Sequence, residues 1–66
     1  MLHVRFEGRS YDLDPKKLAI VVGMNDREIK SRVAQHLDVG QRRLDGYVID
    51  RPSSGELILR PEAIYG

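Results

Sequence analysis

The chain has 66 residues, no cysteine and almost balanced charge, with 11 Lys and Arg against 10 Asp and Glu. A chain of this length buries only about 60% of its unfolded surface, so we expect one domain over residues 1–66, with no room for a large internal ligand site. The missing cysteines exclude a disulfide framework and a thiolate metal site. Charges near the N-terminus and the lack of an apolar run of ~18 residues predict a soluble cytoplasmic protein with no membrane partner.

Residues 1–14 have the pattern of a β-hairpin. Apolar and polar residues alternate from Leu2 to Glu7, and the alternation resumes at Tyr11 after Gly8-Arg9. A glycine at the first position of a two-residue loop suits a primed turn. The predicted cross-strand pairs are Phe6–Tyr11, Val4–Leu13, Arg5–Asp12 and His3–Asp14.

Residues 15–24 leave two interpretations open. Asp14-Pro15 resembles a capped turn with proline in the first helical position. The run Leu18–Val22 is apolar throughout, so it fits either a buried strand or an irregular crossover whose aliphatic side chains pack under the helix. We favour the crossover.

A helix is predicted over Asp26–Asp38. Asn25 can serve as its N-cap, with Glu28 at the third helical position. Its apolar residues form one stripe at helical spacing. They are Ile29, Val33, Ala34 and Leu37. Gly40 is expected to stop the helix.

Two further strands are predicted at residues 47–50 and 56–60, joined by the turn residues 51–55. Both strands are more uniformly apolar than the first hairpin, so we expect them in the centre of the sheet. One alternate set of their side chains must then face away from the helix, and Val48 and Ile58 are the expected members.

The order of elements is ββ-α-ββ, which predicts an α+β domain with one helix packed on a mixed four-stranded sheet. The segment Ile29–Val33 followed by Val39–Leu44 resembles the ubiquitin helix and the bend after it. The strand Glu56–Arg60 and a tail ending in Gly66 resemble the last ubiquitin strand and its tail. This resemblance implies the ubiquitin-like β-grasp fold.

The sequence does not favour an enzyme, a cofactor or a metal site. Its serines cannot be placed beside His3 or His36 with an orienting acid, as a nucleophilic triad requires. A pair made by His3 and Asp14 supplies two zinc ligands where three or four are needed. Nucleic acid binding is an unfavoured alternative, because it requires Lys16-Lys17 and Arg42-Arg43 to converge beside an aromatic platform.

The favoured function is a non-catalytic protein-interaction module whose partner the sequence does not name, with a homodimer as one form of it. The candidate interaction residues are Val48, Ile58, Ile64 and Tyr65. The alternative is a ubiquitin-like modifier or sulfur carrier, in which an activating enzyme would adenylate the Gly66 carboxylate. In that case the tail would have to thread into the active site of the activating enzyme. The bulky residues at positions 64 and 65 disfavour this.

Overall fold

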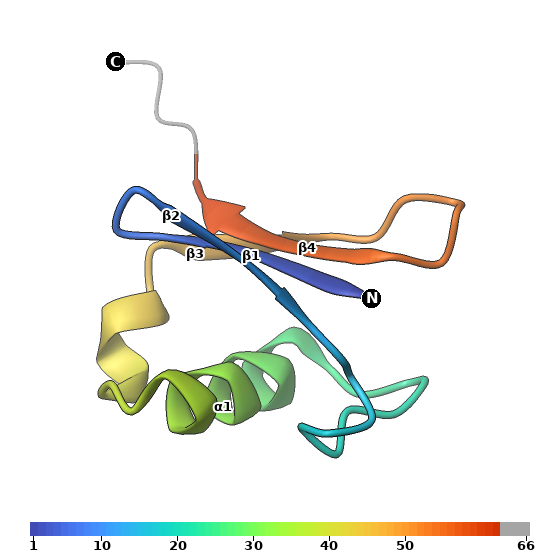
Figure 1. Cartoon of the computed structure of the whole chain (residues 1–66), viewed down its shortest axis with the longest axis horizontal. Coiled ribbons are helices and arrows are strands. Elements are labelled where there is room, and N and C mark those ends of the chain that lie inside the picture. The colour runs from blue at the N-terminus through green and yellow to red at the C-terminus, as the bar shows by residue number, and fades with distance from the viewer. Residues whose placement is uncertain (63–66) are drawn as a thin grey trace.

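A helix lies against one side of a four-stranded sheet, as Figure 1 shows, in a computed structural model that describes residues 1–62. The strands are β1 (Leu2–Phe6), β2 (Arg9–Leu13), β3 (Tyr47–Asp50) and β4 (Leu57–Pro61). The helices are α1 (Asp26–Leu37) and a short 3-10 helix, η1 (Gln41–Leu44). The predicted α+β class and the ββ-α-ββ order are confirmed.

The strand order is β2-β1-β4-β3. β1 and β4 pair in parallel at the centre, and each is flanked by its antiparallel hairpin partner. The expectation that both late strands are central is therefore right for β4 and wrong for β3, which forms an edge. The apolar content of β3 reflects its packing on the core through Tyr47 and Ile49 rather than a central place.

The first hairpin forms, but the predicted register is wrong. Val4 pairs with Tyr11 and His3 pairs with Asp12, so the two-residue loop is Glu7-Gly8. Both loop residues have positive φ, 51° at Glu7 and 77° at Gly8, which is the requirement of a type I′ turn. Glycine thus takes the second loop position. Because this moves each pairing by two residues, the buried face is unchanged.

The segment between β2 and α1 is an irregular crossover, as favoured from the sequence. Asp14 accepts a hydrogen bond from the Lys16 amide at 3.0 Å, and the chain then turns without forming a strand. Leu18 and Ile20 are buried in the core. Ala19 lies between them at a φ of 57°, a left-handed conformation that is uncommon for residues other than glycine.

The ends of α1 follow from its sequence. The Asn25 side-chain oxygen accepts a hydrogen bond from the Glu28 amide at 2.9 Å, so the predicted N-cap is confirmed. The predicted stop at Gly40 is wrong, because Asp38 takes the left-handed conformation. The amide of Val39 donates to Ala34 O at 3.0 Å and that of Asp38 to Gln35 O at 3.2 Å, which is a Schellman motif.

One hydrophobic core fills the space between α1 and the sheet. Its fully buried residues come from both the helices and the sheet. Figure 1 shows α1 crossing beneath the strands. The largest of the fully buried residues are Leu2, Val4, Ile29, Val33, Leu44 and Leu59. Among residues 1–62, no second helix covers the other face of the sheet, which we call the open face.

Candidate functional site

An apolar pocket opens beside the crossover, between the N-terminal end of α1 and the β3–β4 loop. Its volume is about 380 Å³. We call it the crossover pocket. It is lined by Met1, Pro15, Ile20, Val21, Val22, Gly23, Ile29, Arg51, Pro52, Gly55, Glu56 and Leu57.

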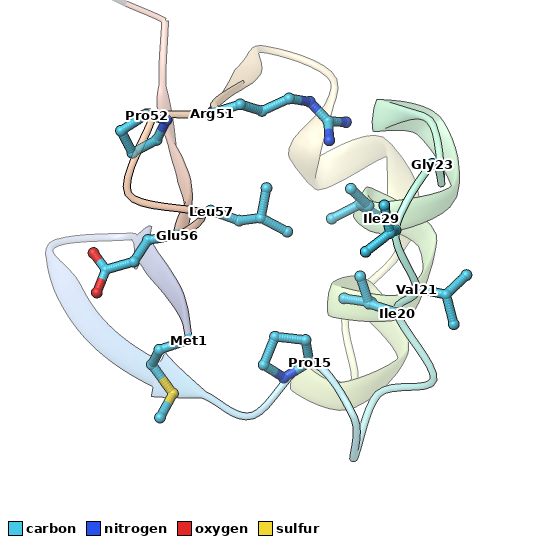
Figure 2. Close-up of a pocket in the computed structure, with 12 residues that line it drawn as sticks. Met1, Pro15, Ile20, Val21, Gly23, Ile29, Arg51, Pro52, Glu56 and Leu57 are labelled. Carbon is cyan, nitrogen blue, oxygen red and sulfur yellow. The ribbon is translucent and has the colours of Figure 1, made fainter.

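The walls of the crossover pocket come from four parts of the chain, namely Met1, the crossover, the first turns of α1, and the β3–β4 loop with the start of β4. Figure 2 shows Leu57 of β4 and Ile29 of α1 pointing toward one another across it, with Ile20 and Pro15 below them. Ile29 and Ile20 are buried, so this part of the wall belongs to the hydrophobic core. A wall built on core residues is held in place before any partner arrives, which lowers the cost of binding.

Arg51 ties the two sides of the crossover pocket together. Its guanidinium donates to Asp26 Oδ1 at 2.5 Å and to the Met24 carbonyl oxygen at 3.2 Å. The arginine directly follows β3, whereas Met24 lies just before α1 and Asp26 is its first residue. These contacts therefore fix the β3–β4 loop against the helix N-terminus.

The rim of the crossover pocket carries aliphatic side chains that the fold leaves in water. The exposed fraction is 56% for Met1, 65% for Val21 and 105% for Val22. They are the exposed large hydrophobic residues of the described chain. Each of these side chains leaves apolar surface in contact with water. Burying that surface against a partner would be favourable by about 25 cal/mol per Å².

Val48 and Ile58, the interaction residues proposed from the sequence, lie on the open face. Val48 pairs with Arg60 and Ile58 with Asp50 in the β3–β4 ladder, and all four are half-buried. Arg60 donates to Asp50 Oδ2 at 2.5 Å between the two aliphatic residues. The open face therefore combines a small apolar area with ion pairs, and it lies apart from the crossover pocket, which neither Val48 nor Ile58 lines.

His3 also lies on the open face, where it bridges two carboxylates. Its Nδ1 is 2.5 Å from Asp12 Oδ1, and its Nε2 is 3.3 Å from Glu56 Oε2. The predicted pairing with Asp14 is wrong because of the register of the hairpin, and Asp14 instead caps the crossover turn. The hydrogen bond to Asp12 is the main cause that raises the pKa of the His3 imidazole above its ordinary value of 6.5, with Glu56 adding to it.

This raised pKa predicts a pH-dependent contribution of His3 to stability. A group whose pKa is higher in the folded state stabilises the fold fully below its unfolded pKa of 6.5 and loses that effect as the pH rises through the folded value. We expect the urea midpoint of the wild type, relative to that of His3→Gln, to fall as the pH rises above about 6.5. A difference that does not change with pH, or an NMR titration of His3 centred at or below its ordinary pKa, would contradict this.

The other site predictions meet the structure in different ways. Ile64, Tyr65 and Gly66 lie outside the described residues. Figure 1 shows the crossover, which carries Lys16-Lys17, at the opposite end of α1 from η1, which carries Arg42-Arg43, so these four cations do not converge. Arg43 instead pairs with Glu7 and lies 5.5 Å from the Phe6 ring centroid.

In the part of the chain that spans residues 1–62, no three His, Asp or Glu side chains group to hold a metal ion. None of its helices is long and apolar enough to cross a membrane.

Sequence reasoning missed the crossover pocket as a site. The signal was the surplus of aliphatic residues in an irregular segment, since five consecutive apolar residues in a crossover cannot all reach the core. Leu18 and Ile20 do, and Val21 and Val22 are left at the surface. No family model, curated protein or solved structure matches the chain.

Proposed function

We propose that this protein is a non-catalytic protein-interaction module of ubiquitin-like β-grasp type. The central parallel pair of first and last strands, the two flanking hairpins and the single helix support that fold assignment. The partner we propose is a polypeptide that inserts an aliphatic or aromatic anchor side chain into the crossover pocket. The observation that carries this function is the exposed Val21 and Val22 at the rim of a preformed apolar wall.

Apolar anchors in preformed pockets dominate the energy of protein interfaces. An anchor that is fully buried against such a wall gains about 1.5–3 kcal/mol from burial alone. A volume of about 380 Å³ is at the lower end of the range for ligand pockets, which suits one or two side chains better than a large cofactor. The Arg51 contacts join the two sides of the pocket in the free protein.

The test compares two substitutions of exposed or half-buried aliphatic residues on different faces. Tagged wild type, Val22→Asp and Ile58→Asp are used to capture partners from source-cell lysate, followed by mass spectrometry. We expect a partner that the wild type and Ile58→Asp retain and that Val22→Asp loses, because a carboxylate at the rim opposes burial of the anchor. Circular dichroism of each variant checks that the fold is intact.

The remaining outcomes of this comparison decide between surfaces. Loss with Ile58→Asp and retention with Val22→Asp would move the interaction to Val48 and Ile58 on the open face. A complex made only of this chain, seen by sedimentation, would identify the partner as a second copy. Adducts that survive denaturation and map to Gly66 would contradict a noncovalent module and support the modifier or carrier alternative.

A further inference from the structure

A second groove, unlike the first, is lined by basic side chains. Arg27 and Lys30 of α1 and Arg42 of η1 line it together with Gln41 and Asp45, and its volume is about 550 Å³. We call it the basic groove. It shares no lining residue with the crossover pocket.

The charge of the basic groove is not neutralised within the described chain. Three cations and one carboxylate give it a formal charge of +2. In residues 1–62, no ion pair involves Arg27, Lys30 or Arg42, although Arg43 and Arg51 each hold a carboxylate. Like charges brought together in one groove repel each other, and an anion of charge −2 would relieve that repulsion.

The backbone that presents Arg42 is fixed before any ligand binds. The Arg43 amide donates to Gly40 O at 3.0 Å and the Asp45 amide donates to Arg42 O at 3.2 Å, which closes η1. Leu44 of η1 is fully buried in the core and anchors the turn against α1. Two helices that are packed together thus hold the backbone positions that carry the cations beside one groove.

We propose that the basic groove binds a phosphate monoester carried by a partner protein. A phosphorylated side chain has a charge of about −1.5 to −2 at neutral pH, which matches the groove. Two guanidinium groups can each donate paired hydrogen bonds to phosphate oxygens, with Lys30 as a further charge and the Gln41 amide as a neutral donor. The proposal does not depend on the crossover pocket.

The composition of the basic groove favours a phosphorylated protein over nucleic acid. Its lining residues include no aromatic side chain on which a base could stack. The net charge of the whole chain is only +1, so no broad positive field extends along a nucleic acid backbone. The three cations line a single groove, which suits one phosphate group better than an extended backbone of phosphates.

The experiment titrates the isotope-labelled protein with a short glycine peptide that carries one phosphoserine, and follows backbone amides by NMR. We expect saturable shifts at residues 27, 30, 41 and 42, and much weaker shifts with the same peptide carrying serine. Arg42→Gln should weaken binding about tenfold or more, since it removes charged hydrogen bonds. Arg32→Gln is the matched control, because Arg32 is a helix arginine outside the groove, and it should change the affinity less than about twofold.

Each other result overturns the proposal. Shifts that do not saturate, equal binding of the serine peptide, or equal weakening by both arginine variants would mean that the groove is not a phosphate site. Tighter binding of an oligonucleotide, a phosphoinositide vesicle or inorganic phosphate than of the phosphopeptide would assign the anion to another source. Val22→Asp should leave phosphopeptide binding unchanged, so this test and that of the proposed function can fail separately.

Discussion

Replacing Leu59 by alanine is expected to lower the free energy of unfolding by about 2–5 kcal/mol, the range for a leucine truncated in a core. Leu59 is fully buried at the centre of the sheet, where β4 pairs with both β1 and β3. A domain of this length has a total stability of about 3–10 kcal/mol, so the variant would lose a large share of it. Urea unfolding followed by circular dichroism measures the loss.

Ile58→Ala is the matched control for Leu59→Ala, since the two residues are adjacent and face opposite sides of the sheet. Ile58 is half-buried on the open face and does not belong to the core cluster. We expect its truncation to cost less than half as much as that of Leu59. Equal losses would show that Ile58 is packed as tightly as the core and would contradict its place on an open face.

Phe6→Ala is expected to have an effect of similar size, about 3–5 kcal/mol for a buried phenylalanine. Phe6 closes one end of the core. Its ring centroid lies 5.7 Å from that of Tyr47 on β3, at an interplanar angle of 40°, and the Arg43 guanidinium carbon lies over it at 5.5 Å. The substitution therefore loosens β1, β3 and η1 at once. Thermal unfolding and the NMR spectrum of residues 41–47 would show it.

Arg43→Gln distinguishes the contribution of the Phe6 ring to stability from that of the cation above it. The Arg43 side chain is about half exposed, and its ion pair with Glu7 is exposed too. We expect a loss of about 1 kcal/mol or less from the cation–π contact and the ion pair together. A loss as large as that of Phe6→Ala would mean that the cation, rather than the packing of the ring, holds this end of the core.

The sequence predicted correctly those elements whose apolar spacing fits only one arrangement. The stripe Ile29, Val33, Ala34 and Leu37 allows only one helix face, and Asn25 allows one natural start. The hairpin was different, because moving the loop by one residue shifts each pairing by two and keeps Val4 opposite an apolar partner. The alternation therefore identified the face but not the register, which depended on whether Gly8 takes the first or the second loop position.

The site was less predictable than the fold because it depends on what the fold leaves uncovered. Alternation correctly named Val48 and Ile58 as facing away from the helix. Alternation could not show that Val21 and Val22 remain exposed, since these residues lie in the turn that the Met24 amide closes on Val21 O rather than in any repeat. The basic groove joins Arg27 to Arg42 across two helices, and only the packing of η1 on α1 brings such distant residues together.

The parallel pairing of β1 with β4 also determines how the domain resists mechanical load. Leu2 lies beside Leu57 and Val4 beside Leu59, so the start of β1 and the end of β4 are at opposite ends of one ladder. A force that pulls these two ends apart slides the strands along each other and loads the hydrogen bonds between them together. A force that pulls the edge strand β3 sideways from one end would instead break its hydrogen bonds with β4 one at a time. The domain is therefore stiffest when the load runs along its central pair of strands.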